Sequence, residues 1–282
     1  MAAAELSLPT IAILGTGSMG RAILSGLLQP DIRVEGGIRV TNRSRERASE
    51  FDSVDGVTGL STEENPEANR EAVAGARIVL VAVKPSMVTA LLEEIADAIG
   101  PGTIVVSVAA GVTSAVFEAR LPSSVSIIRA MPNTPAIVGK AVTGLSAGTR
   151  SSDDDLALVT ALFGTVGETL VVPEERLDAV SSISGSGPAY VFYLIEQLTA
   201  TAISKGFTPE QATLLVEGTF EGAAALLAAS DRTPAELRRQ VTSPKGTTER
   251  AIAELEKAGL KALFDRATDA AVERSRELAA GA

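Results

Sequence analysis

Short apolar runs, rich in β-branched residues, alternate with helix-like segments through residues 10–150. This alternation is typical of a parallel sheet built from βαβ units. The predicted strands cover residues 10–14, 38–41, 77–83, 103–107, 126–130 and 141–147. The predicted helices follow Gly17, cover residues 45–52, and begin near Ser86, near Ser114 and after Ser152, where three aspartates follow a residue suited to the N-cap.

The pattern changes after Pro173. Residues 168–172 still predict a strand, but beyond the proline the apolar residues recur at helical spacing, as they do over residues 191–202. We therefore predict an α/β Rossmann-type N-terminal domain followed by an all-α C-terminal dimerisation domain. The predicted dinucleotide-binding domain covers residues 1–172, and the helical dimerisation and substrate-binding domain covers residues 173–282.

The helical segment at residues 189–204 is apolar around most of its circumference. A surface helix normally shows a polar face, so we expect this one to be buried against a second subunit, in a homodimer formed through the C-terminal helices. The alternative is a helix at the centre of a monomeric bundle. Two capping boxes with proline at the first helical position, beginning at Thr208 and Thr233, predict further helices.

Composition excludes several classes of function. The 282 residues carry a net charge of −10, which argues against a nucleic-acid backbone or an anionic membrane as partner. The chain has no cysteine and no histidine, so we expect no metal site and no histidine acid or base. No uncharged apolar stretch is long enough to span a bilayer, and residues 1–6 lack the basic region of a secretory signal. We expect a cytoplasmic location.

A glycine-rich loop, Gly15-Thr16-Gly17-Ser18-Met19-Gly20, follows the first predicted strand and opens a predicted helix. In a dinucleotide site the first glycine permits the tight turn, the second lets the backbone approach the pyrophosphate, and the third lets helix and strand pack closely. The alternative is a βα turn without a ligand. In the predicted site, residues Gly15 to Met19 bind the cofactor.

The end of the second predicted strand distinguishes between cofactors. An NAD site normally has an acidic residue there, which accepts a hydrogen bond from the ribose 2′-hydroxyl. This chain instead reads Asn42-Arg43-Ser44-Arg45, in which the arginines could bind a 2′-phosphate and Ser44 could donate to it. We predict NADPH, with NADH as the alternative, and assign Asn42, Arg43 and Ser44 to the cofactor site. A solvated helix start is the other interpretation, and it suits Arg45 better than Arg43.

Other strand ends supply further candidates, because open α/β sheets bind ligands at the carboxyl ends of their strands. Lys84 follows an apolar strand, and Pro85 stops that strand and fixes where the lysine points. The next strand ends in small residues, and another ends in a proline-rich loop that contains Asn133. The residues predicted here to bind the cofactor are Ala82, Val83, Lys84, Pro85, Ala109, Gly111 and Asn133.

Residues 241–249 combine hydroxyls, a proline and a glycine in a turn that opens on a helical pattern. Unpaired N–H groups, hydroxyls and the helix dipole at such a turn favour a small anion. Residues 184–190 add a glycine-rich segment before the long apolar helix, for which a cap and hinge is the alternative interpretation. The two halves of the chain thus indicate a redox cofactor and a small acidic substrate.

The chain resembles the pyrroline-5-carboxylate reductases in collinear segments that span nearly its whole length. The matching segments are residues 15–20, 82–85, 129–135, 184–190 and 241–248. The resemblance implies NAD(P)H-dependent reduction of 1-pyrroline-5-carboxylate to L-proline. It also implies a Rossmann domain and a helical domain that interlocks with a second subunit, often within larger assemblies of dimers.

The resemblance also assigns roles in the turn. Ser243 and the backbone N–H groups of Gly246 and Thr247 hold the substrate carboxylate, and the Thr248 hydroxyl contacts the ring nitrogen as the catalytic residue. Lys245 stands where the family usually has a second glycine. If that position needs a positive φ, lysine costs on the order of 1 kcal/mol, and it could also supply a charge for the carboxylate.

Two alternatives to this function remain. A related imine or β-hydroxyacid reductase would use the same first domain, but a hydroxyacid enzyme needs a proton donor, commonly a lysine on the long helix after the first domain. Residues 188–203 contain no lysine, which disfavours that alternative. A non-catalytic NADPH-binding regulator is the second, and it would not need the hydroxyl-rich turn.

Overall fold

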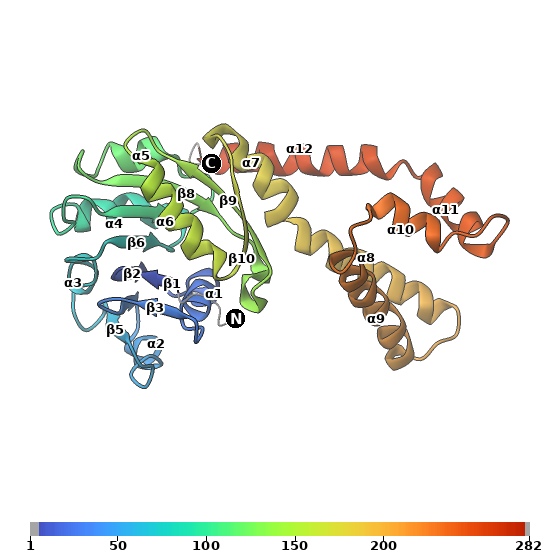
Figure 1. The fold of residues 1–282 in the computed structure, drawn as a ribbon, viewed down its shortest axis with the longest axis horizontal. Coiled ribbons are helices and arrows are strands. Elements are labelled where there is room, and N and C mark those ends of the chain that lie inside the picture. Colours follow the sequence, from blue (N-terminus) through green and yellow to red (C-terminus); the bar gives the residue numbers. More distant parts are fainter. Residues whose placement is uncertain (1–5, 280–282) are drawn as a thin grey trace. The chain divides into compact units, whose positions relative to one another are not determined.

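The computed structural model describes residues 6–279, and its main sheet has eight strands in the order β10-β9-β8-β7-β6-β2-β4-β5 (Figure 1). The strands are β2 (Ile11–Leu14), β4 (Ile38–Asn42), β5 (Val57–Ser61), β6 (Ile78–Val81), β7 (Ile104–Ser107), β8 (Ser126–Met131), β9 (Ala141–Ala147) and β10 (Gly167–Val171). From β5 to β8 this is the strand order of a Rossmann sheet, with its switch point between β2 and β6. The predicted fold class is confirmed.

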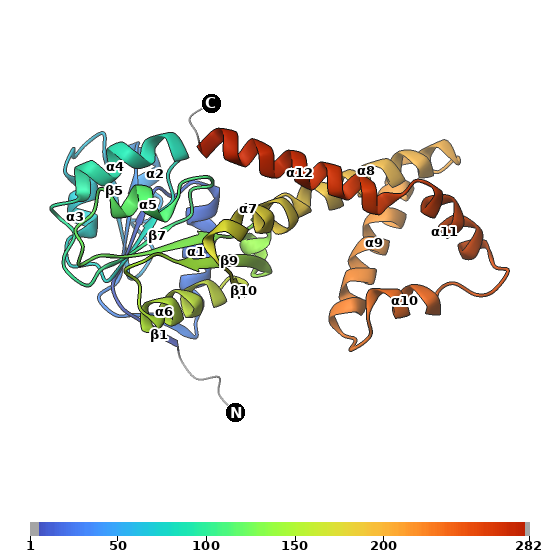
Figure 2. The ribbon, with the colours of Figure 1, turned by 90° about the horizontal axis from the view of Figure 1, so that it is seen from above.

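Helices cover both faces of the sheet (Figure 2). The helices of this part are α1 (Ser18–Leu27), α2 (Arg45–Ser49), α3 (Ala68–Val73), α4 (Val88–Ile95), α5 (Ser114–Glu118) and α6 (Asp153–Gly164). Helices α1 and α6 pack on one face, where Ile13 and Leu80 are fully buried. Helices α3, α4 and α5 pack on the other, against Leu14 and Val81. The central strands are therefore apolar on both faces, as a parallel sheet requires.

Two strands, β9 and β10, run against the predicted direction. β9 pairs antiparallel with β8, while β10 is parallel to β9. The prediction of an entirely parallel sheet was wrong at this edge. Only residues 132–140, which include the short helix η2 (Thr134–Val138), connect β8 to β9, and a parallel crossover needs a dozen residues or more.

Some elements were not predicted. The two-stranded sheet of β1 (Leu6–Leu8) and β3 (Ile32–Val34), the edge strand β5 and helix α3 are all short. β5 also contains Gly59, whose added Cβ would lie 2.2 Å from the carbonyl oxygen of Ala48 in α2. The close approach of α2 therefore requires glycine at this one position, where it interrupts the apolar pattern of the strand.

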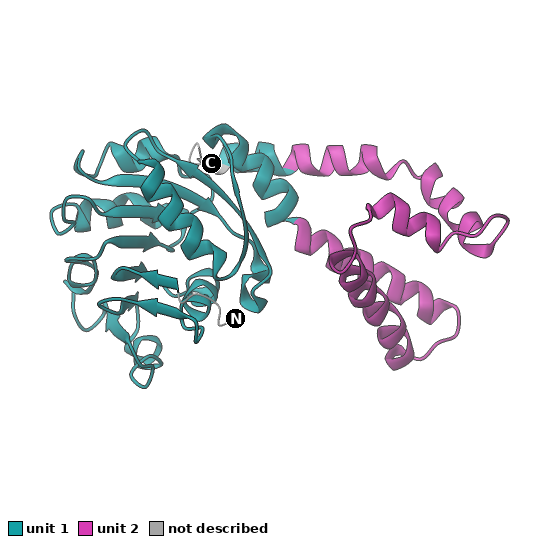
Figure 3. Ribbon diagram, in the orientation of Figure 1, with its two compact units in different colours: residues 1–186, 271–282 teal, residues 187–270 magenta. Residues whose placement is uncertain are grey.

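The chain divides into two units, one of residues 1–186 and 271–282 and one of residues 187–270 (Figure 3). The first unit also holds η1 (Pro85–Met87), η3 (Glu174–Arg176), α7 (Leu177–Val180) and the π-helical turn η4 (Ser181–Gly185). The boundary predicted between residues 172 and 173 lies inside this unit, directly after β10, and it stays a prediction of where the folding domains meet.

The second unit is helical, as predicted. It comprises α8 (Gly187–Ser204), α9 (Pro209–Ala228), α10 (Pro234–Gln240), α11 (Thr247–Lys257) and most of α12 (Leu260–Ala279). Both predicted capping boxes are present, from Thr208 to Gln211 and from Thr233 to Glu236.

Helix α8 is not the centre of a bundle within this chain. None of its residues is buried, and Phe192 and Tyr193 are 66% and 60% exposed. Leu214 of α9 is 76% exposed. The monomeric alternative was therefore wrong, and burial against a second subunit stays a prediction.

Helix α6 begins in a buried polar cluster. Ser152 caps it as predicted, in a capping box with Asp155. The Asp155 carboxylate also accepts hydrogen bonds from Arg77 and from the Ser126 hydroxyl, each at 2.7 Å. Burial raises the pKa of Asp155, but hydrogen bonds from Arg77, Ser126 and Ser152 outweigh burial and lower this pKa to about 2.

Replacing Asp155 with asparagine is expected to lower the free energy of unfolding by about 2 kcal/mol at pH 7. In the folded protein the pKa of Asp155 lies below its ordinary value of 3.8. The ionised carboxylate therefore stabilises the fold fully above pH 3.8, and this stabilisation is lost as the pH falls toward about 2. The difference between wild type and Asp155→Asn, measured by urea unfolding, should shrink by about 1 kcal/mol between pH 6 and pH 3. A difference that does not change with pH would show that Asp155 acts through shape alone.

Candidate functional site

A cavity of about 800 Å³ lies at the carboxyl ends of β2, β4 and β6, beside the switch point of the sheet. Many of the predicted cofactor residues line it together: Gly15, Thr16, Gly17, Asn42, Arg43, Ala82, Val83 and Lys84. They come from separate segments of the chain, and the structure brings them to one place.

The glycine loop has the geometry that the sequence predicted. Gly15 has a φ of 94°, and an added Cβ would lie 3.0 Å from the carbonyl oxygen of Ala82. Around Gly17 no other atom lies within 4 Å of an added Cβ, so its backbone faces open space. At Gly20 an added Cβ would lie 2.3 Å from the carbonyl oxygen of Gly15. The loop therefore fits the pyrophosphate of a dinucleotide.

Hydrogen bonds tie the glycine loop to the end of β4. The buried Thr16 hydroxyl donates to Asn42 Oδ1 at 2.6 Å, and the Gly15 N–H donates to the carbonyl of Thr41 at 3.1 Å. Arg21 of α1 donates from Nε to the carbonyl of Thr16 and from Nη1 to Glu50, just after α2. The Asn42 amide group is thus engaged with the loop, and the segment that follows it is held in place.

The three arginines after β4 differ in their surroundings. Arg43 lines the cavity, and its Nε lies 3.3 Å from Glu63 in an exposed ion pair. Arg45 pairs with Glu64 at 2.8 Å and is not part of the cavity lining. Arg47 lines the cavity, although sequence reasoning did not select it. Its place in the same short run of arginines directly after β4 is the signal that could have found it.

The other predicted cofactor residues do not line this cavity. Ser18 and Met19 begin α1, Ser44 is the residue before α2, and Pro85 begins η1. Ala109 and Gly111 follow β7, where Gly111 has a φ of 77°. Asn133 donates to the carbonyl of Ser184 and accepts from the N–H of Val142, each at 2.9 Å. A role in cofactor binding stays a prediction for all of these.

Sequence reasoning missed several residues that line the cavity. They are Thr62, Asn69, Ser86, Met87, Ala90, Leu91 and Glu94. The Asn69 amide donates to both oxygens of Glu94, at 3.0 and 3.3 Å. Asn69 lies on α3, a helix that the sequence did not predict, so no strand end pointed to it.

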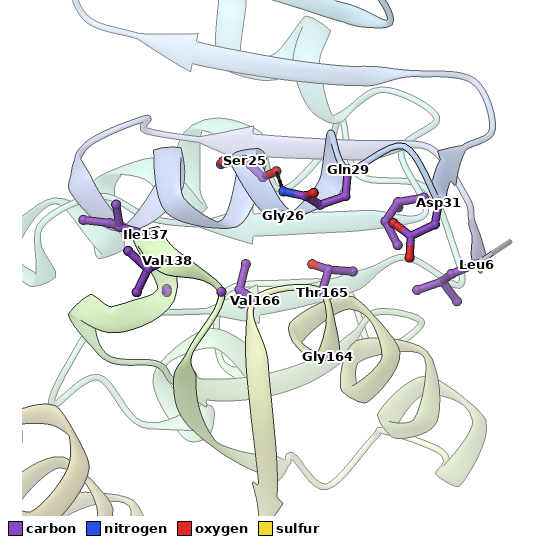
Figure 4. Close-up of a pocket in the computed structure, with 13 residues that line it drawn as sticks. Leu6, Ser25, Gly26, Gln29, Asp31, Ile137, Val138, Gly164, Thr165 and Val166 are labelled. Atoms are coloured by element: carbon purple, nitrogen blue, oxygen red, sulfur yellow. Dashed lines mark hydrogen bonds between the residues drawn. The ribbon is translucent and has the colours of Figure 1, made fainter. Parts of the chain in front are cut away.

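A second cavity, of about 690 Å³, lies along α1 in the same unit (Figure 4). Ser25, Gly26 and Gln29 form one wall, and Thr165 and Val166 face them. None of the predicted site residues lines it, and its lining has no lysine or arginine to bind a phosphate. The phosphate-binding chemistry thus belongs to the cavity beside the glycine loop.

The hydroxyl-rich turn precedes α11 in the second unit. The Gly246 N–H donates to the carbonyl of Ser243 at 3.0 Å, which closes the turn. An added Cβ at Gly246 would lie 2.8 Å from Ser243 Oγ, so only glycine fits there. Within residues 6–279, the side-chain hydroxyls of Ser243, Thr247 and Thr248 make no hydrogen bond. These hydroxyls, with the first N–H groups of α11, are available to an anion.

Lys245 lies in this turn with a φ of 61°, the one positive φ outside glycine among the described residues. Its N–H donates to Glu249 Oε2 at 2.8 Å. The position therefore does adopt the left-handed conformation that favours glycine, as the sequence comparison with the family suggested. Whether the ammonium group serves the substrate carboxylate stays a prediction.

Replacing Lys245 with glycine is expected to raise the free energy of unfolding by about 1 kcal/mol, because glycine adopts a positive φ without a Cβ clash. Urea unfolding of the full chain measures the change. Lys245→Ala is the matched control, since it removes the same charge but keeps the Cβ. Equal stabilisation by both substitutions would assign the effect to charge instead of backbone strain.

Among the described residues no cluster of acidic, cysteine or histidine side chains could hold a metal ion. No helix within residues 6–279 has the length and apolar character needed to cross a membrane.

Two family models match the chain. Residues 174–278 match a pyrroline-5-carboxylate reductase dimerisation domain, and residues 10–111 match an NADP oxidoreductase, coenzyme F420-dependent family. A pyrroline-5-carboxylate reductase of Corynebacterium melassecola is 38% identical over 95% of this chain and 98% of its own.

Solved structures agree with the sequence relatives. The chain is similar to a pyrroline-5-carboxylate reductase of Coxiella burnetii, with a TM-score of 0.87, 37% identity and coverage of 95% of this chain and 97% of that one. It is also similar to a Plasmodium falciparum pyrroline carboxylate reductase with NADP bound, with a TM-score of 0.79, 25% identity and coverage of 96% and 98%. Both similarities extend through the two units.

Proposed function

The chain belongs to the pyrroline-5-carboxylate reductase family, and we propose that it reduces the C=N bond of 1-pyrroline-5-carboxylate to give L-proline, with NADPH as cofactor. The observation that carries the proposal is the turn before α11. The family resemblance assigns substrate contacts to Ser243, to the backbone N–H groups of Gly246 and Thr247 and to the hydroxyl of Thr248, and the hydroxyls of Ser243 and Thr248 make no hydrogen bond within residues 6–279. A protein that only bound a dinucleotide would not need them.

The residues of the turn divide the work of binding. Ser243 and the backbone at Gly246 and Thr247 hold the ring carboxylate, where the start of α11 favours negative charge. Because the Gly246 N–H already donates to Ser243, the Thr247 N–H is the freer donor of the two. Thr248 orients the ring nitrogen through its hydroxyl.

The proposed reaction requires little acid catalysis from the protein. Bound NADPH would supply the hydride. A protonated cyclic imine already carries positive charge at its C=N bond, so the hydride step needs no strong general acid, and this chain has no histidine. Positioning and hydrogen bonding by the turn can then provide most of the rate. Lys84 lines the cavity beside the glycine loop, and we assign it to the cofactor instead of to acid catalysis.

Purified protein mixed with NADPH and 1-pyrroline-5-carboxylate tests the function. We expect loss of NADPH absorbance and formation of proline. Tight NADPH binding without any loss of absorbance would favour the non-catalytic regulator. Oxidation of a β-hydroxyacid with NADP⁺, without reduction of the cyclic imine by NADPH, would favour the related reductase, which the absence of lysine on α8 disfavours.

We further propose that the protein forms a homodimer through its C-terminal helices and that such dimers can build larger assemblies. The support is the dimerisation family model and the exposed apolar side chains of α8 and α9. Light scattering after size exclusion distinguishes monomer, dimer and larger species. We propose that the protein is located in the cytoplasm, which cell fractionation tests. We also propose that it binds neither nucleic acid nor membrane.

A further inference from the structure

The cavity beside the glycine loop holds two arginines from the segment after β4, and only one of them was predicted from the sequence. Arg43 lies outside α2, just before the N-cap residue Ser44, and Arg47 lies within the helix. Arg45 is the first residue of α2, and its guanidinium pairs with Glu64 at 2.8 Å. The lining contains Arg43 and Arg47 but not Arg45.

The backbone of Arg47 is linked to the glycine loop. The Thr16 hydroxyl donates to Asn42 Oδ1, and the Asn42 amide donates in turn to the carbonyl of Arg47 at 3.4 Å. Arg21 adds a second connection, because it bonds both Thr16 and Glu50. Arg47 therefore keeps its place relative to the loop that fits the pyrophosphate.

The charges around the two arginines also differ. Arg43 shares its charge with Glu63 in an exposed ion pair, which a phosphate dianion can displace because such pairs are weak. Within residues 6–279, Arg47 has no carboxylate in ion-pair contact with its guanidinium. The nearby Glu50 carboxylate, whose pKa the charge of Arg47 helps to lower, is paired with Arg21 instead. Arg47 is therefore the cation of this segment that can meet an anion in the cavity without first breaking an ion pair.

We propose that Arg47 binds the 2′-phosphate of the dinucleotide together with Arg43, and that Arg47 is a main determinant of the preference for NADPH over NADH. The inference rests on the proposed use of NADPH. It assigns no such role to Arg45. A guanidinium–phosphate contact is a charge-assisted hydrogen bond that NADH, which has only a 2′-hydroxyl there, cannot form.

The test compares Arg47→Ala with its matched control Arg45→Ala. NADPH and NADH are titrated separately into each full-length protein, without imine substrate, and followed by nucleotide fluorescence. Arg47→Ala should weaken NADPH binding about tenfold or more and change NADH binding less than twofold, since a hydrogen bond to a charged group is worth about 1.5–3 kcal/mol. Arg45→Ala should leave both affinities within twofold of wild type.

Several outcomes would overturn the inference. They are equal weakening of NADPH and NADH by Arg47→Ala, no weakening of NADPH, or a loss in Arg45→Ala as large as in Arg47→Ala. The titrations need no turnover, so a wild-type protein that prefers NADPH but fails to reduce the imine contradicts the proposed reaction and not the role of Arg47. A wild type that prefers NADH contradicts both. Thermal melting of each variant shows that the fold is retained.

Discussion

Replacing Gly17 with alanine is expected to weaken NADPH binding about a hundredfold while leaving the stability of the fold unchanged or slightly raised. Gly17 has a φ of −67° and a ψ of −168°, which alanine adopts without strain. Nothing else lies within 4 Å of the new Cβ, so the folded protein accepts it. The methyl group instead fills the space over which the backbone meets the pyrophosphate. Loss of one or two charge-assisted hydrogen bonds costs about 3 kcal/mol, or about a hundredfold in affinity.

Gly20→Ala provides the contrast. Its Cβ would lie 2.3 Å from the carbonyl oxygen of Gly15, so α1 must move away from the strand before it. We expect both properties to suffer here, with a loss of stability of about 1–3 kcal/mol. NADPH titration and urea unfolding of both variants measure the two effects. If Gly17→Ala destabilised the protein as much as Gly20→Ala, the assignment of Gly17 to ligand approach would be wrong.

The sequence predicted the fold where local pattern and burial agree. The apolar runs that became β2, β6 and β7 are entirely buried, so a continuous apolar stretch was sufficient evidence for them. Strands β1 and β3 are three residues each and partly exposed, so no apolar run marks them. The direction of β9 follows from the length of the connection that precedes it. The apolar pattern of the strand itself carries no information on direction.

The candidate site shows the same division. Glycines with a backbone role could be predicted from the sequence, because no residue with a Cβ fits at Gly15 or Gly20. Asn69 and Glu94 could not, because they reach the cavity from α3 and α4, far from the strand ends in the sequence. Arg45 and Arg47 could be distinguished only once Glu64, from a different strand end, was found beside Arg45.

Thr248→Ala is expected to lower kcat/KM for 1-pyrroline-5-carboxylate about thirtyfold. Thr248 is the second residue of α11 and half-buried, and its hydroxyl makes no hydrogen bond within residues 6–279. Removing it should therefore cost the fold little. A hydroxyl that orients the imine nitrogen contributes to the reaction about what a hydrogen bond to a charged group contributes elsewhere, about 2 kcal/mol.

Thr248→Ser is the matched control, since it keeps the hydroxyl and should stay within about threefold of wild type. NADPH affinity without imine should not change in either variant, because the Thr248 hydroxyl is assigned to the imine and Thr248 does not line the cavity beside the glycine loop. A fall in kcat would show that the hydroxyl acts in the transition state, whereas a rise in KM alone would show that it only helps to bind the substrate. If Thr248→Ala kept kcat/KM within twofold of wild type, the ring nitrogen would have to be oriented by another group, and the unengaged hydroxyls of Ser243 and Thr247 would be the next to replace.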